Sequence, residues 1–167
     1  YMWQGFIPQP ENPHAKNPER GFLESANQRP VDSTYPYFIP GSYITPRAIT
    51  IENKLAVMSG ITPKDMMALH GNYFNTLAED VRSTLVQYVN ETVLNATEKK
   101  YLAIIKNWDL MASPDSKGQT VYQCWWDSLE VDLWQDDLAS VSPQAPWPEQ
   151  QTTLALLKKD SALHFID

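Results

Sequence analysis

The chain has 167 residues with 43% hydrophobic and 11% aromatic side chains, a composition typical of a folded protein with a buried core and not of a disordered chain. Twenty acidic against 13 basic side chains leave a net charge of −7 and a pI near 4.9, so binding to nucleic acid or to an anionic membrane is not expected. No long apolar run predicts a membrane span, and the lone Cys124 excludes an internal disulfide.

The first quarter of the chain is rich in proline. Eight of the 13 prolines, from Pro8 to Pro46, precede residue 47, which predicts loops because proline lacks the backbone N–H that regular elements need. Only Phe22–Ala26 alternates well enough to predict a short strand. We therefore expect a loop-rich segment with short extended stretches over residues 1–45 and a helical region over residues 46–167, together forming one mainly α-helical structural unit.

The first two helices are predicted from their terminal residues. Thr45 and Pro46 provide an N-cap hydroxyl and a first-turn proline for a helix that should end at Gly60. Thr62 and Asp65 have the spacing of a second N-terminal cap. Apolar residues then recur every three or four positions up to Tyr88, which predicts one long amphipathic helix weakened only at Gly71. Its apolar face comprises Met66, Leu69, Tyr73, Phe74, Leu77, Val81, Leu85 and Tyr88.

Three further helices are expected in the remainder. One should begin near Thr97 and end before the turn at residues 113–118, with Tyr101, Ile104, Ile105 and Trp108 buried. The next should cover residues 120–139 and end before the prolines of residues 143–148. A last helix should begin at Pro148 and carry Leu154, Leu156 and Leu157.

Common catalytic and metal-binding motifs are absent from the sequence, including the P-loop, the dinucleotide-binding glycine pattern and paired cysteines. Isolated histidines are more often surface or core residues than metal ligands, so none is predicted at His14, His70 or His164. We expect Cys124 to be a small buried hydrophobe. The acidic residues on the 120–139 helix are expected to form a solvated surface; they are Asp127, Glu130, Asp132, Asp136 and Asp137.

One segment is more informative. Asn17-Pro18-Glu19-Arg20-Gly21 is followed by the predicted strand and then by Ala26-Asn27-Gln28-Arg29-Pro30. This resembles the N-P-x-x-G, strand, A-N-N-x-P signature of the penicillin acylase family, amidases of the N-terminal-nucleophile hydrolase superfamily. The similarity continues at Tyr43–Ile51, where the family places an arginine that opens a helix, and more loosely at Asp65-Met66 and Trp108-Asp109.

The resemblance implies roles for two residues. Asn27 matches the loop asparagine whose side-chain amide helps to stabilise the oxyanion of the tetrahedral intermediate. Arg47 matches the supporting arginine that orients this asparagine. From the residues alone, Asn27 is a turn residue before Pro30 and Arg47 is a cation on a helix surface.

The resemblance also implies what must come from elsewhere. The family's nucleophile is an N-terminal serine whose α-amine is the general base, and Ser25, Ser33 and Ser42 have no free amine. We therefore expect an internal fragment of the large chain, inactive alone, whose partners are the rest of that chain, the small chain and a linear amide substrate. The only carboxylate between Asn27 and Arg47 is Asp32. It does not occupy the position at which the family has a calcium-binding carboxylate, so no metal or other cofactor is predicted.

For the parent protein, the resemblance implies hydrolysis of a linear amide, such as an N-acyl β-lactam or an acyl-homoserine lactone, in the periplasm or after secretion. The alternative is a non-catalytic helical protein-interaction module. An amidase fragment should place Asn27 and Arg47 together at an open edge, whereas an interaction module should have an exposed apolar groove.

Overall fold

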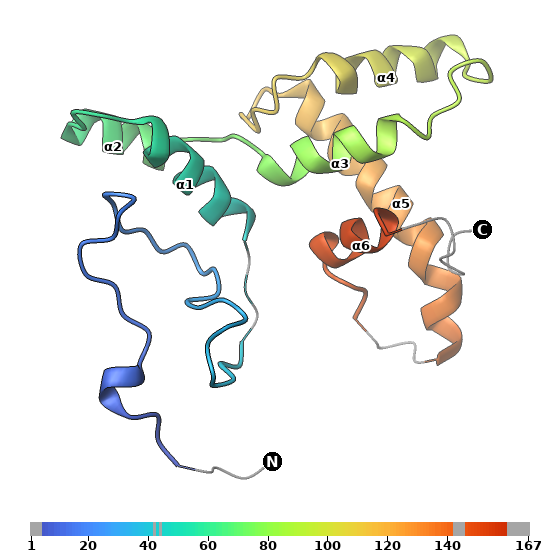
Figure 1. Cartoon of the computed structure of the whole chain (residues 1–167). Helices are drawn as coiled ribbons and strands as arrows, with labels where there is room; N and C mark the ends of the chain where they lie inside the picture. Colours follow the sequence, from blue (N-terminus) through green and yellow to red (C-terminus); the bar gives the residue numbers. More distant parts are fainter. Residues whose placement is uncertain (1–4, 42, 44, 142–145, 160–167) are drawn as a thin grey trace. The chain divides into compact units, whose positions relative to one another are not determined.

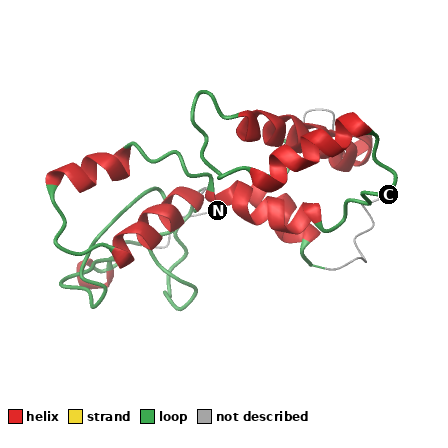
Figure 2. Ribbon diagram, turned by 90° about the horizontal axis from the view of Figure 1, so that it is seen from above, coloured by secondary structure: helices red, strands yellow, loops and turns green. Residues whose placement is uncertain are grey.

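The computed structural model describes residues 5–41, 43, 45–141 and 146–159. Within these ranges every named element is helical and none is a strand (Figures 1 and 2), which confirms the prediction of a mainly α-helical fold. The elements are the 3-10 helix η1 (Gln9–Glu11) and the α-helices α1 (Pro46–Val57), α2 (Pro63–His70), α3 (Thr76–Val86), α4 (Ala96–Asn107), α5 (Lys117–Val141) and α6 (Gln150–Leu157). None of these helices is both long enough and apolar enough to cross a membrane.

The chain forms two compact units, Tyr1–Asn72 and Tyr73–Asp167. In the first unit a long loop precedes α1 and α2, and tyrosine hydroxyls connect distant parts of this loop. Tyr35 Oη donates to the Glu11 carbonyl at 2.8 Å, and Tyr37 Oη donates to the Glu11 carboxylate. The two rings meet edge to face with centroids 5.6 Å apart. Hydrogen bonds from side chains therefore connect distant parts of this loop, as backbone hydrogen bonds between strands would in a sheet.

The prediction of a strand at Phe22–Ala26 is wrong. Its residues have no ladder partner among the described residues, and an extended segment becomes a strand only by pairing with another. The backbone N–H of Ala26 instead donates to the side chain of Gln28 at 2.6 Å. The segment is thus held by a local side-chain contact.

The predicted beginnings of α1 and α2 are confirmed, although only one has the expected cap. At α2 the hydroxyl of Thr62 accepts from Asp65 N at 3.4 Å and the Asp65 carboxylate accepts from Thr62 N at 2.8 Å, which is a complete capping box. The Thr45 side chain makes no such capping bond to α1. Helix α1 also ends at Val57, three residues before Gly60, whose φ of +60° places it in the turn that follows.

The single helix predicted from the Thr62 cap to Tyr88 is instead two helices. Helix α2 ends at His70 and α3 begins at Thr76, where the Asn75 side chain accepts from Ala78 N at 2.9 Å. The residues between them pair with the segment after α4: Asn75 N donates to Leu110 O and Ala112 N donates to Tyr73 O, both at 2.8 Å. This non-local pairing adds to the weak helix propensity of Gly71.

The second unit has a helical core. Helix α4 packs against α3 and α5, and Trp108 and Trp126 are buried among aliphatic side chains. The buried cluster comprises Ala78, Val81, Leu85, Ile105, Trp108, Leu110, Tyr122, Trp126 and Leu154. The helices predicted near residues 97–112, over 120–139 and from 148 onward are each present, but α4 ends at Asn107, five residues before the predicted end, with Trp108 just beyond it. The proline stretch at 143–148 lies partly outside the described residues, as does His164.

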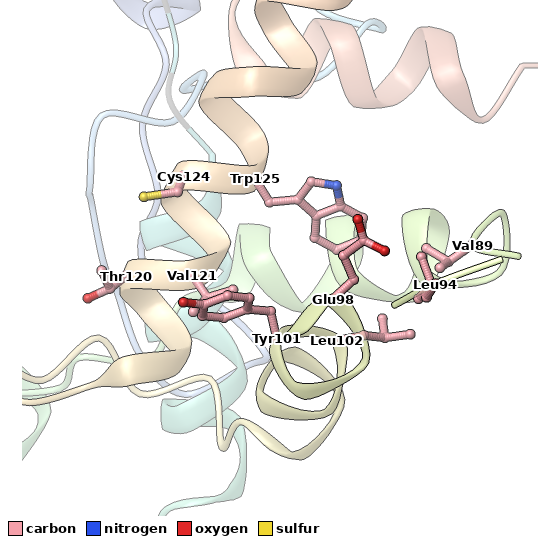
Figure 3. A pocket seen from close by; sticks show the side chains of 9 residues that line it. All are labelled: Val89, Leu94, Glu98, Tyr101, Leu102, Thr120, Val121, Cys124 and Trp125. Atoms are coloured by element: carbon pink, nitrogen blue, oxygen red, sulfur yellow. The ribbon is translucent and has the colours of Figure 1, made fainter. Parts of the chain in front are cut away.

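Two predictions of burial in this unit are wrong. Tyr101 is 51% exposed and Cys124 is exposed. Both line a groove between α4 and α5, where the turn-by-turn spacing was correct but the facing helix leaves these side chains accessible (Figure 3). Helical periodicity identifies a face but not how completely a neighbouring helix covers it.

Buried polar contacts connect α6 to α5. Trp134 Nε1 donates to Thr153 Oγ1 at 3.2 Å, and Gln150 Nε2 donates to Tyr122 Oη at 2.9 Å. Burial of Tyr122 raises the pKa of its hydroxyl well above the ordinary value, so the group that accepts from Gln150 at physiological pH is the neutral hydroxyl.

Gly118 is the tightest position in the second unit. A Cβ built on this residue would lie 2.1 Å from Cγ and 2.3 Å from Cδ1 of Trp108. The indole is itself buried, and its Nε1 donates to Met111 O at 3.0 Å. The first turn of α5 therefore packs directly on the ring, and no larger residue fits without displacing it.

We predict that Gly118→Ala lowers the free energy of unfolding by about 2 kcal/mol or more, although glycine to alanine within a helix normally raises it. Thermal unfolding monitored by tryptophan fluorescence measures the change. Gly71→Ala is the matched control, because its added Cβ would meet atoms no closer than 3.8 Å. Equal melting temperatures for wild type and Gly118→Ala would contradict the packing described.

Candidate functional site

Asn27 lies on the loop before α1, between a buried and a half-buried residue. Ala26 is 5% exposed and Asn27 itself is exposed. The backbone of Asn27 has a φ of +67°, in the left-handed region that asparagine tolerates better than most residues. The loop thus turns sharply at this residue and presents its amide to solvent.

Arg47 meets Asn27 from the first turn of α1. Its Nη2 donates a hydrogen bond to Asn27 Oδ1. A guanidinium can only donate, so the contact fixes the carboxamide with its oxygen toward Arg47 and its Nδ2 away from it. The structure therefore brings together the two residues singled out in the sequence, at an exposed position, and leaves the N–H donors of Nδ2 facing away from Arg47.

A second set of contacts supports the same loop. Gln28 Oε1 accepts from Ala26 N at 2.6 Å, and Gln28 Nε2 donates to both oxygens of Glu24 at 2.8 Å. The guanidinium of Arg20 lies 3.5 Å from Glu24 Oε1 and 3.3 Å from Glu52 Oε1. Glu52 belongs to α1, so the loop and the helix are joined at a second point besides Asn27 and Arg47.

The sequence did not identify this second set. Arg20, Glu24 and Gln28 are spaced four residues apart, which indicates contact on a helix, but the segment is not helical. Glu52 is 32 residues from Arg20 along the chain. Only the position of Arg20, Glu24 and Gln28 within the family signature could have drawn attention to them, and Glu52 lies outside that signature.

An open depression lies beside the pair in the first unit. Its volume is about 1060 Å³, and both polar and apolar side chains line it. Gln28 and Ala48, the chain neighbours of Asn27 and Arg47, contribute to it, as do the charged residues Arg20, Glu24, Arg29, Asp32 and Glu52. Arg29 is held over the ring of Tyr43, 5.1 Å from its centroid. Asn27 and Arg47 are not themselves among its lining residues, so the depression adjoins the pair through their neighbours in the chain.

The second unit has a groove of a different kind (Figure 3). It measures about 690 Å³ and is largely apolar, and Figure 3 shows side chains of α4 and α5 facing each other across it. Its lining residues are Val89, Leu94, Glu98, Tyr101, Leu102, Thr120, Val121, Cys124 and Trp125. Glu98 is committed to the N-terminal cap of α4, since it accepts from Asn95 N at 2.8 Å. The groove has no cluster of catalytic side chains.

Asp32 is engaged in its own turn. Its Oδ1 accepts from Thr34 N at 2.8 Å and from Thr34 Oγ1 at 2.6 Å, and these bonds hold the pKa of the carboxyl below its ordinary value. The described residues contain no group of three or more histidine, cysteine or carboxylate side chains that could hold a metal. Most acidic residues of α5 are exposed, as expected for a solvated surface; Glu130 is half-buried.

Comparison with known protein families gives a match over nearly the whole chain. The family described as penicillin amidase matches residues 1–166. No solved structure matches the chain at a significant level. The family match covers both the loop that carries Asn27 and the helices of the second unit.

We predict that the Asp32 carboxyl titrates below pH 3.8, its ordinary midpoint, because Thr34 stabilises its charged form. The turn is then fully stabilised above pH 3.8 and loses this contribution as the pH falls through the folded-state pKa. Thr34→Val removes the hydroxyl donor and should move the midpoint upward. Carboxyl chemical shifts followed by NMR measure both; an unchanged midpoint in Thr34→Val would contradict the assignment.

Proposed function

The chain belongs to the penicillin amidase family, and we propose that it is part of a hydrolase that cleaves a linear amide, such as the N-acyl group of a β-lactam or of an acyl-homoserine lactone. The observation that carries this proposal is the hydrogen bond from Arg47 to Asn27 Oδ1. It orients a neutral double donor at an exposed loop, and the chain neighbours of both residues, Gln28 and Ala48, line a concave surface. Such a donor is what a reaction that develops negative charge on oxygen requires.

The proposed nucleophile is an N-terminal serine outside this chain. Its Oγ attacks the amide carbonyl carbon while its own α-amine takes the hydroxyl proton through a water molecule, and the carbonyl oxygen becomes an oxyanion. Asn27 Nδ2 donates to that oxyanion. The tetrahedral intermediate then expels the amine, which takes the proton, and water releases the acyl group from the serine. A donor of this kind contributes about 3 to 4 kcal/mol to lowering the barrier.

Arg47 acts through Asn27 in this scheme. Its charge-assisted bond to Oδ1 holds the carboxamide in one orientation and polarises it, which strengthens the N–H groups as donors. An aspartate at position 27 would present oxygen on both sides and could not donate. The residue types at 27 and 47 therefore suit an oxyanion site.

The partners proposed for this chain are the rest of the large chain, the small chain of the processed enzyme and the amide substrate. This chain alone is then inactive, because the reacting serine and its amine are not in it. No metal or other cofactor enters the proposed reaction. A periplasmic or secreted location is proposed from the family alone.

A non-catalytic interaction module is the second candidate, and the apolar groove between α4 and α5 favours it. Family membership and the arrangement of Asn27 with Arg47 favour the amidase. The two candidates differ in whether amide turnover depends on Asn27.

We predict that Asn27→Ala in the full-length enzyme lowers kcat for an N-acyl p-nitroanilide by roughly a hundredfold or more, because the oxyanion loses a donor. Release of p-nitroaniline measures the rate. Turnover within about threefold of wild type would rule out the oxyanion role.

Asn17→Ala is the matched control for this substitution. Asn17 is also an exposed loop asparagine with a positive φ, of 48°, so alanine there costs a similar backbone strain. It makes no contact with Arg47 among the hydrogen bonds of the described loop. A loss caused by strain alone would be equal in the two variants.

We predict that Arg47→Ala lowers kcat roughly tenfold, since the carboxamide of Asn27 is then free to rotate away. Lysine at this position retains one donor and should recover part of the loss. Lys54→Ala, which removes a cation from the last turn of the same helix, is the control and should leave kcat unchanged. An Arg47→Ala variant as active as Lys54→Ala would contradict the positioning role.

A further inference from the structure

The contacts around Asn27 form a closed network of hydrogen bonds and ion pairs, called the circuit below. Starting at Asn27, they run to Arg47 on α1 and along that helix to Glu52. From Glu52 they return to the loop through the side chains of Arg20, Glu24 and Gln28, ending at the backbone of Ala26. The residue whose amide faces outward is thus held from both sides, by its own side chain and by the backbone that precedes it.

Gln28 is the member of the circuit that fixes this backbone. Its Oε1 accepts from Ala26 N at 2.6 Å, so the side chain folds back over Asn27 and closes the turn. Its Nε2 donates to both Glu24 oxygens at 2.8 Å. Only a side chain that accepts at one end and donates at the other can satisfy both neighbours, and a carboxamide does so.

Glu24 gives these contacts their strength. Its side chain is 7% exposed, and a buried carboxylate needs charge and hydrogen-bond partners. Gln28 provides two hydrogen bonds and Arg20 provides the opposite charge. Removal of Gln28 would leave Glu24 short of donors and Ala26 N short of an acceptor, so the loop would rearrange around them.

We infer that Gln28 is a positioning residue for the oxyanion site, holding the left-handed turn at Asn27 through its bonds to Ala26 N and Glu24; this rests on the proposed function. An oxyanion donor acts only when it lies at hydrogen-bond distance from the developing charge, and displacement by about 1 Å is costly. The placement of the Asn27 amide then depends on Gln28, whose hydrogen bonds are to Ala26 N and to Glu24.

Gln28→Met in the full-length enzyme tests the inference, because methionine has a similar length and removes both polar ends. We expect kcat for an N-acyl p-nitroanilide to fall by about tenfold or more while KM stays within about twofold, since binding surfaces are retained and the donor is displaced. Gln135→Met, at an exposed glutamine of α5, is the matched control and should have wild-type kcat.

Gln28→Glu separates positioning from general loss of structure. Near neutral pH it places a second carboxylate against Glu24, with Arg20 as the only cation in contact with Glu24 among the described residues. When one of the two carboxyls is protonated, the pair can share that proton, and the introduced side chain can still accept from Ala26 N. The ratio of the variant's kcat to that of wild type should therefore rise as the pH falls from about 8 to about 5.

The outcomes are distinguishable. A kcat for Gln28→Met within about threefold of wild type, with Asn27→Ala impaired, overturns this inference and leaves the proposed function intact. The inference is also overturned if the ratio of the kcat of Gln28→Glu to that of wild type does not change with pH. Wild-type turnover by Asn27→Ala overturns the proposed function itself. If Gln28→Met does not fold, as judged by circular dichroism, the pH ratio of Gln28→Glu decides alone.

Discussion

The hydrogen bond from Arg47 to Asn27 is the constraint on which the first unit depends. It joins a loop without regular structure to the first turn of a helix, and it sets which end of the carboxamide faces outward. The loop meets this constraint without a sheet, through the contacts of Gln28, Glu24 and Arg20 and through the tyrosines bound to Glu11. A segment of low regular structure can thus hold one side chain in a defined orientation.

Local signals in the sequence predicted most of the helices. Thr62 with Asp65 marked the beginning of α2, and apolar spacing marked α4, α5 and α6. The errors arise from contacts that are distant in sequence. The break at residues 71–75 depends on pairing with Leu110 and Ala112, and Cys124 is exposed because α4 does not fully cover that face of α5. Neither is visible in a short window of sequence.

The two site residues were found through a family signature and not through their chemistry. Asn27 and Arg47 are ordinary turn and helix residues until a pattern that spans their separation of 20 positions connects them, and the structure places them in contact. Arg20, Glu24 and Gln28 lie within the same signature segment, but their mutual contacts could not be predicted, because these contacts depend on a loop path that no periodicity encodes. Glu52 lies outside the signature. The donors and acceptors of these side chains come within contact distance only in the folded loop.

The way the first loop is held has a consequence for amide proton exchange. Tyr35 and Tyr37 fasten it by side-chain hydroxyls, whereas exchange protection depends on the bonds that each backbone N–H makes. A described backbone donor such as Ala26 N, whose acceptor is a side chain, is shielded only while that side chain stays in place. Isotope exchange in this loop therefore reports on the orientation of a few side chains, and slow exchange at Ala26 is a measure of how firmly the turn at Asn27 is closed.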